Sequence, residues 1–294
     1  MQTAAVTCDV MTLEDDWAPL GARAPTDLAE TRLASHWAAQ IPAAAGATLA
    51  EPKEDHSHTS LSWSKAHGAL VGVALPDGRR AGLSLADLAL VVLADDAVEA
   101  RCALAGLTLE EGLTWLAGQL GGAALRRPAL GRPAHDLPAH PAEEGAPFEA
   151  GDPGAREELA RWFGDASALL EGVSRERGAS PVRCWPHHFD IATLLALDVL
   201  DEGGGERGDE EARSVGVGMT PGDGRYAEPY LYVTPWPYPA PAALAPLPLG
   251  RWHTEGWVGA VLTGTELVGE SQPAASQRFI EAAIRACLTA LGAD

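Results

Sequence analysis

The chain has 294 residues, of which 46% are hydrophobic, and its 21 basic and 41 acidic residues give it a formal charge of −20. That hydrophobic content is typical of a folded globular protein and excludes wholesale disorder. The negative charge argues against binding to nucleic acids or anionic membranes, because their phosphates would be repelled.

Neither a secretion signal nor a membrane span is expected. Acidic residues occupy positions 9 and 14–16, where a signal peptide would carry basic residues and an apolar run. No run of eighteen apolar residues is present to cross a bilayer. The cysteines, at positions 8, 102, 184 and 287, form no C-x-x-C pair, so neither a disulfide framework nor a structural zinc site is indicated. We therefore expect a cytoplasmic protein.

The first half of the chain is predicted to contain a helix, a set of antiparallel strands and a second helix. Residues 1–25 show no hydrophobic period and are expected to form a loose N-terminal arm held at Trp17. Thr26 is the predicted N-cap of the first helix, whose apolar residues recur at four-residue spacing. Thr108 and Glu111 form a capping box that begins the second helix, which ends near residue 120. Between the helices, strands are predicted over residues 58–64, 69–75 and 80–85, with a strand or short helix over 88–93.

A proline-rich connector over residues 122–153 separates this half, residues 26–121, from a second half, residues 154–294. Asp152 and Pro153 begin its first helix, and an amphipathic helix ends the chain. The strands predicted between them are 182–197, interrupted at Pro186, then 214–219, 228–234 and 257–262. An insertion over 201–212 is rich in glycine and charge, and we expect a surface loop there.

The two halves resemble each other in sequence as well as in order. Val71-Gly72-Val73 followed by Asp77-Gly78-Arg79 parallels Val215-Gly216-Val217 followed by Asp223-Gly224-Arg225. The interpretation is an α+β protein of two similar halves, each made of a helix, antiparallel strands and a helix. The alternative is that two ordinary α+β segments look alike through chance and shared composition.

Pairs of histidines and carboxylates suggest a functional site in the second half. Residues i and i+2 of a strand share a face, so His188 would lie beside Asp190, and His253 beside Glu255. Buried groups of this kind need partners. Histidine nitrogen and carboxylate oxygen are ligands of Zn²⁺, and two histidines with a carboxylate would equally suit iron or manganese. Asp190 or Glu255 could then act as a catalytic general base. His58, in the His56-Ser57-His58 segment, is a weaker metal candidate supported only by its match to His188.

An aromatic cluster is the second signal. All of the tyrosines, at 226, 230, 232 and 238, lie within thirteen residues of one another. Aromatic walls with few polar groups form ligand pockets, although the same residues could form a sheet core and its rim. The ligand-binding candidates are Trp185, Glu228, Tyr230, Tyr232, Trp252 and Trp257.

Three short motifs carry a family resemblance: Ser180-Pro181-Val182, the W-P-H-H-F-D-x-A stretch from Trp185 to Ala192, and Glu228-Pro229-Tyr230-Leu231-Tyr232. With these motifs, most of the chain resembles a bacterial family of a domain of unknown function. The resemblance implies a shared fold and no activity.

Two classes of function follow from the sequence. One is a metal-assisted enzyme, with a hydrolase as the first choice, that uses His188, Asp190, His253 and Glu255 with a divalent metal. The alternative is a non-enzymatic small-molecule-binding protein whose aromatic side chains form the pocket wall. The sequence indicates no oligomeric state.

Overall fold

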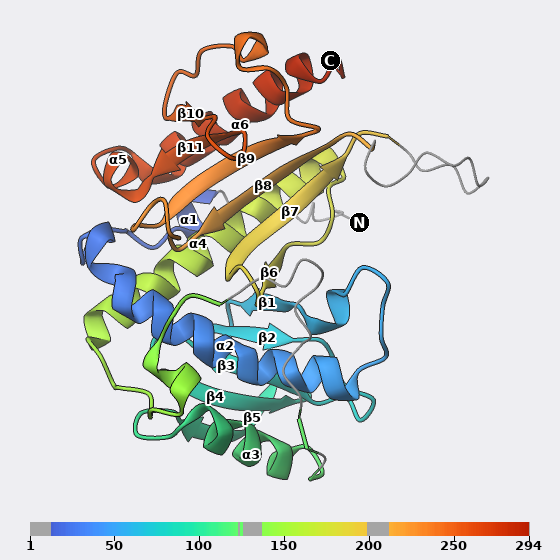
Figure 1. Ribbon diagram of the computed structural model, residues 1–294, viewed down its shortest axis with the longest axis vertical. Coiled ribbons are helices and arrows are strands. Elements are labelled where there is room, and N and C mark those ends of the chain that lie inside the picture. Colours follow the sequence, from blue (N-terminus) through green and yellow to red (C-terminus); the bar gives the residue numbers. More distant parts are fainter. Residues whose placement is uncertain (1–12, 123, 126–136, 199–211, 294) are drawn as a thin grey trace, which may run out of the picture.

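One antiparallel sheet organises the part of the chain that the computed structural model describes, which is residues 13–122, 124–125, 137–198 and 212–293 (Figure 1). It has 11 strands in the order β10-β11-β9-β8-β7-β6-β1-β2-β3-β4-β5. The first half contributes β1 (Leu61–Ser64), β2 (Ala69–Gly72), β3 (Arg80–Ser84), β4 (Ala89–Ala94) and β5 (Ala97–Ala103). The second half contributes β6 (Arg183–Trp185), β7 (Asp190–Ala196), β8 (Ser214–Thr220), β9 (Tyr230–Trp236), β10 (Arg251–His253) and β11 (Gly259–Thr263).

The longer helices form one layer against this sheet. The helices are α1 (Leu13–Asp16), α2 (Ala29–Leu49), α3 (Leu109–Gln119), α4 (Pro153–Arg177), α5 (Gly264–Val268) and α6 (Gln272–Ala290). The short α1 packs on α4. Short 3-10 turns are η1 (Pro25–Leu28), η2 (Ser57–Thr59), η3 (Pro141–Glu144) and η4 (Pro241–Ala243). The capping predictions at Asp152 and Thr108 are confirmed, because Asp152 accepts from Gly154 N and Thr108 from Glu111 N. Thr26 is not an N-cap, since it lies inside η1, and α2 begins at Ala29.

The halves meet where β1 pairs with β6, and Leu61 lies directly opposite Cys184 in this pair. Residues directly opposite each other in antiparallel strands point to the same face. The pairings continue from Cys184 to Ile191, Met219 and Leu231, and all of these side chains are buried. One face of the sheet therefore carries the hydrophobic core from β1 across to β9.

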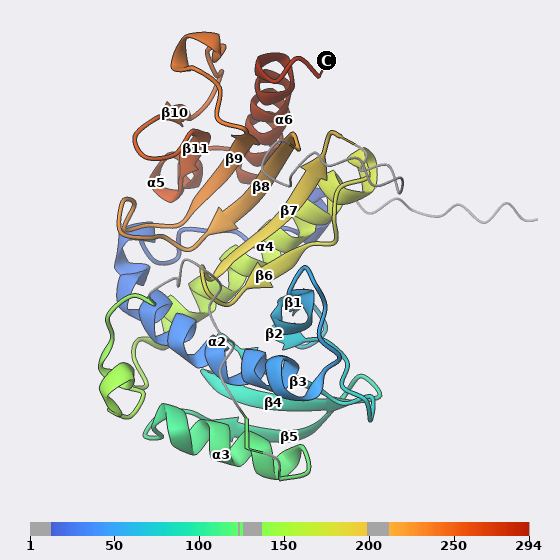
Figure 2. The same ribbon diagram turned by 45° about the vertical axis from the view of Figure 1, so that its right-hand side comes forward.

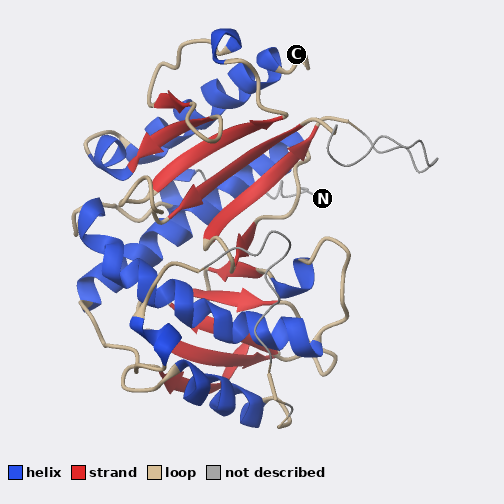
Figure 3. Cartoon of the chain, in the orientation of Figure 1, coloured by secondary structure: helices blue, strands red, loops and turns tan. Residues whose placement is uncertain are grey.

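The helices cover that same face in both halves. α2 packs on β2 and β3, α4 on β7 and β8, and α6 on β9, and their buried side chains belong to one continuous core. Figures 1 and 2 show α2 in front of the lower strands but α4 behind the upper ones. Because the sheet face is the same, this change of side reflects the strong twist of the sheet. Figure 3 shows the strands continuing from one end of the molecule to the other.

The α+β class is confirmed by the layer of helices on an antiparallel sheet. The internal duplication is not confirmed. Counted outward from the β1–β6 junction, Val71 lies on the second strand of its half, whereas Val217 lies on the third. β6 is the extra strand that causes this offset.

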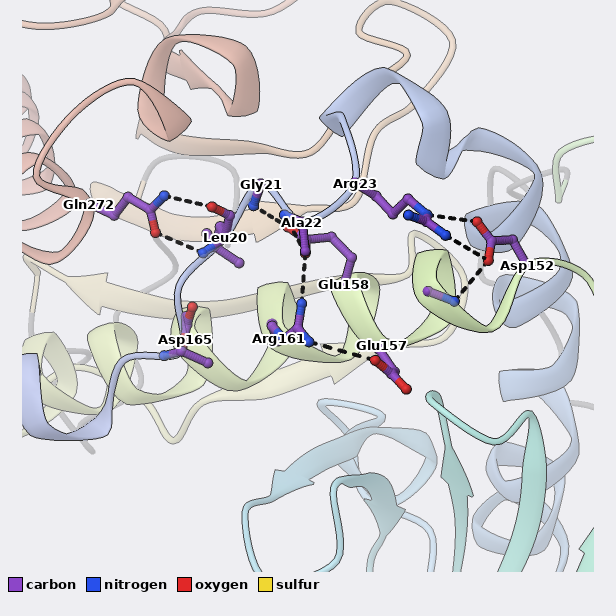
Figure 4. Close-up of polar contacts among 12 residues, drawn as sticks. Leu20, Gly21, Ala22, Arg23, Asp152, Glu157, Glu158, Arg161, Asp165 and Gln272 are labelled. Atoms are coloured by element: carbon purple, nitrogen blue, oxygen red, sulfur yellow. Dashed lines mark hydrogen bonds and ion pairs between the residues drawn. The ribbon is translucent and has the colours of Figure 1, made fainter.

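Residues 17–23 do not form the loose arm predicted from the sequence, because side chains of α4 and α6 hold their backbone (Figure 4). Asp165 accepts a hydrogen bond from Ala18 N at 2.8 Å. Glu158 accepts from Gly21 N at 2.6 Å and from Ala22 N at 3.2 Å. Gln272 Oε1 accepts from Leu20 N and from Trp17 Nε1, so Trp17 is an anchor as expected. We call residues 17–23 the N-terminal strap.

The connector contains more order than its prolines suggested. It includes η3, and Phe148 is buried and forms a parallel bridge with Ala105. Trp37 Nε1 donates to Pro138 O at 2.8 Å, which attaches the connector to α2. Residues 1–12, 126–136 and 199–211 lie outside the described residues, as does nearly all of the predicted loop at 201–212. No helix in the described ranges is long and apolar enough to cross a membrane.

Candidate functional site

The sheet face opposite the helices is polar and aromatic over β7, β8 and β9. A pocket of about 250 Å³ opens there. Its lining residues are His188, Asp190, Thr220, Asp223, Tyr230, Tyr232, Thr234, Tyr238 and Trp257. The structure therefore brings together five residues that the sequence singled out, namely His188, Asp190, Tyr230, Tyr232 and Trp257.

Glycines make room for the aromatic rings of this face. Tyr232 pairs with Gly218, and a Cβ at Gly218 would lie 2.5 Å from the Tyr232 hydroxyl oxygen. The Tyr232 ring therefore lies across β8 and reaches Asp190 on β7. Gly259 is covered by the Trp257 ring in the same way. Strand β8 alternates Val215 and Val217, which face the core, with glycines on the open face. This alternation is a sequence signal, which sequence reasoning missed, for a strand that leaves room for aromatic rings.

Asp190 is the central polar group of the pocket. Its Oδ2 accepts a hydrogen bond from the Tyr232 hydroxyl at 2.5 Å. Its Oδ1 is shielded from solvent and has no hydrogen-bond partner among the described residues. Burial raises the pKa of Asp190, and the hydrogen bond from Tyr232 and the charge of His188 partly offset that increase. Burial and the neighbouring Asp190 also raise the pKa of Tyr232, so this phenol stays protonated.

Asp223 is a second carboxylate of the pocket, and the sequence singled it out only as part of the Asp223-Gly224-Arg225 match between the two halves. Its Oδ1 accepts from Arg225 N at 2.7 Å and Tyr226 N at 2.9 Å, which fixes the turn between β8 and β9. Its Oδ2 accepts from the Tyr230 hydroxyl at 2.7 Å. Burial, followed by Asp223, raises the pKa of Tyr230. Each of the two carboxylates therefore holds one tyrosine of the wall.

His253 does not line the pocket and instead packs against Trp257, which does. Its Nε2 donates to Glu255 O at 2.8 Å, so in the neutral ring Nδ1 accepts from the Tyr226 hydroxyl at 3.0 Å. The ring stacks on Trp257, with centroids 4.6 Å apart and planes 28° apart. Both ring nitrogens are thus engaged, and His253 positions the Trp257 wall.

The strand alternation on which the two predicted pairs rested is absent at both places, although His188 and Asp190 still line the same pocket. His188 lies in the turn between β6 and β7, where Phe189 has a φ of 57°, so the strand alternation is broken before Asp190. Glu255 follows the end of β10, and its side chain is 88% exposed, 3.8 Å from Arg225. Among the described residues, no group of three or more His, Cys, Asp or Glu side chains is placed to hold a metal ion.

His58 lies away from this pocket, in η2 beside α2. Its Nδ1 accepts a hydrogen bond from Lys53 N at 3.1 Å, and its ring is buried. Its carbonyl oxygen lies so close to Gly46 that no Cβ would fit there. These contacts give His58 a role in packing the η2 turn against α2.

Three ligand-binding candidates also lie outside the pocket. Glu228 accepts from the backbone and hydroxyl of Thr265, both at 2.6 Å, and so caps the start of α5. Trp252 Nε1 donates to Ala245 O at 2.7 Å while its ring packs against the core. Trp185 pairs with Asp190 on the same face, and its ring contacts His187 instead of the pocket.

Sequence reasoning missed His36, which holds the turn carrying His188. His36 is buried on α2, and its Nε2 donates to Pro186 O at 2.9 Å. Gln40 Nε2 donates to the same carbonyl at 2.7 Å. The His36 ring stacks on Phe189 with centroids 5.1 Å apart. The position of the Pro186–Phe189 turn, and hence of one wall of the pocket, therefore depends on α2 of the other half.

No family model, curated protein or solved structure matches the chain. The resemblance to a domain of unknown function therefore stays a prediction, and function must be argued from the pocket.

Proposed function

We propose that the protein binds a small molecule in the pocket between Asp190 and Trp257. The single observation that carries this proposal is the buried Asp190 Oδ1, which lacks a partner at the wall of an aromatic-lined pocket. A buried polar atom without a partner costs roughly 1–3 kcal/mol. A turn of the Asp190 carboxyl group would open Oδ1 to the pocket, and a ligand that then supplies the missing hydrogen bond would recover part of that cost.

The dimensions and lining of the pocket support a compact ligand. Ligand pockets usually have a largely apolar wall with a few convergent polar groups. Here Tyr230, Tyr238 and Trp257 supply aromatic surface, and Asp190 and Thr234 supply polar atoms. At about 250 Å³ the pocket suits a ligand smaller than most drugs.

Filling the pocket tests the proposal. Thr234 lines it from β9, so Thr234→Phe would place a ring in the cavity. Val98→Phe is the matched control, because Val98 lies on β5, is 48% exposed and is distant from the pocket. We expect fragments that shift the Trp257 indole NMR signal to lose binding to Thr234→Phe and to bind Val98→Phe normally.

The library for this screen should contain neutral, cationic and anionic fragments. Binding that persists in Thr234→Phe would place the ligand elsewhere. A screen in which no fragment moves the Trp257 signal would also contradict the proposal.

A metal-assisted hydrolase is the second candidate. It is favoured by one observation, which is that His188 and two carboxylates, Asp190 and Asp223, line the same pocket. A divalent metal held by these groups would supply a Lewis acid and a bound water. Against it, both nitrogens of His253 are engaged and Glu255 points away.

Elemental analysis of protein purified without a histidine tag separates the two candidates. The hydrolase requires near-stoichiometric zinc, iron or manganese that is lost in His188→Ala. We expect no stoichiometric metal, since the pocket offers one imidazole beside carboxylates that already bind tyrosines. Metal present in the wild type and absent from His188→Ala would reverse the order of the two proposals.

A further inference from the structure

We propose that the ligand of this pocket carries a positively charged nitrogen, as an organic ammonium group does. This inference rests on the proposed function and deepens it. It follows from the charges that line the pocket and from the way in which those charges hold the aromatic rings.

The lining is acidic. It contains the carboxylates of Asp190 and Asp223 and no lysine or arginine, with His188 as its basic group. Outside this lining, Arg32 on α2 is a cation whose charge interacts with that of Asp223. An anionic ligand would face the carboxyl oxygens of both aspartates at close range, whereas a cation would be attracted to them.

The hydrogen bonds of Tyr230 and Tyr232 favour the binding of a cation to their rings. Cations bind to the faces of aromatic rings because the faces carry negative charge. The Tyr232 hydroxyl donates a hydrogen bond to Asp190, and the Tyr230 hydroxyl donates one to Asp223. A phenol that donates to a carboxylate has more electron density in its ring, which strengthens the attraction. The two ring centroids are 6.3 Å apart, so a point midway between them lies within cation–π distance of both rings.

A cation would also relieve the cost of burying Asp190. Burial disfavours the charged form of this carboxyl group, and Oδ1 has no partner within the described chain. A positive charge nearby favours the carboxylate form, and an ammonium N–H can donate to it. Neutral ligands of the same shape would offer only an uncharged donor.

Three probes of similar shape measure this selectivity: 2-phenylethylamine, which is cationic at pH 7, 2-phenylethanol, which is neutral, and phenylacetate, which is anionic. We expect the amine to bind about tenfold more tightly than the alcohol. Hydrogen bonds to charged groups contribute more free energy than neutral ones, and the difference corresponds to about tenfold in affinity. Phenylacetate should bind more weakly than either. Affinities come from titrations followed at the Trp257 indole signal.

Asp190→Asn, which keeps the shape and removes the charge, should reduce the preference for the amine to below about threefold. Glu255→Gln is the matched control, because it removes the same charge from an 88% exposed neighbour outside the pocket. It should leave the tenfold preference intact. An equal loss in both variants would show general attraction to an acidic surface and would overturn the inference.

The wild-type comparison does not depend on how the variants fold. If the alcohol binds as tightly as the amine and Thr234→Phe abolishes both, pocket binding stands and selection for a cation is wrong. If none of the probes and no fragment binds, both the proposed function and this inference are wrong.

Discussion

Glu158→Ala is expected to lower the free energy of unfolding by about 3–5 kcal/mol, which is the usual cost of removing one partner of a buried charged network. Glu158 is completely buried on α4. It accepts hydrogen bonds from Gly21 N and Ala22 N and forms an ion pair with Arg161 at 3.0 Å (Figure 4). Alanine would leave the backbone N–H groups of Gly21 and Ala22, within the N-terminal strap, and the Arg161 guanidinium without this partner. Urea denaturation of both proteins measures the change.

The same substitution should release the strap. Trypsin cleaves after arginine, and Arg23 ends the strap, where it is held by Asp152. We expect cleavage after Arg23 to be faster in Glu158→Ala than in the wild type. Glu157→Ala is the control, because Glu157 is 60% exposed and contacts the same Arg161 at 3.6 Å. Equal effects of the two variants would show that the buried contacts to the strap are unimportant.

The protein is expected to lose about 3 kcal/mol of stability through His36 alone as the pH falls from 7 to 4. Burial is the main cause that lowers the pKa of His36 from 6.5 to about 4, and the charges of Arg32 and His188 act in the same direction. Between those pH values the unfolded state binds a proton that the folded state excludes. The stability contributed by the neutral ring is therefore complete above pH 6.5 and is lost as the pH approaches 4.

The variant His36→Gln tests this dependence. Glutamine keeps an N–H donor for Pro186 O but does not titrate, and the loss of stacking on Phe189 should lower stability at every pH. Urea unfolding at several pH values between 7 and 4 should give a shallower slope for the variant than for the wild type. Parallel curves would contradict the role of His36, because all other titrating groups are common to both proteins.

Local signals in the sequence predicted the elements that depend on neighbouring residues. The capping groups at Thr108 and Asp152 act within three residues, so the sequence locates the helix starts. The strands on either side of the two Asp-Gly-Arg segments were also predicted, because strand and turn patterns depend on neighbouring residues. The start of α2 was missed because Pro25 begins a 3-10 turn that includes Thr26, so the α-helix starts only after that turn.

Contacts between distant segments could not be predicted in this way. No local pattern marks His36 as buried in the first predicted helix, because the turn at Pro186 that packs against it lies 150 positions away in the sequence. Asp190 was found, but its partner Tyr232 depends on the pairing of β8 with β9 and on the space over Gly218. The i and i+2 rule failed at His188 because His188 lies in the turn before β7, where Phe189 has a left-handed backbone.

The two ends of the sheet have a consequence for association between copies of the protein. An unpaired strand at a sheet edge can pair with another chain, and natural proteins discourage this with charged side chains, bulges and short strands. β5 carries Glu99 and Arg101 and pairs with β4 through a register shift at Val92 and Leu93. At the other end, β10 has only 3 residues. Both described edges of the sheet therefore carry features by which natural proteins discourage the addition of a strand from a second molecule.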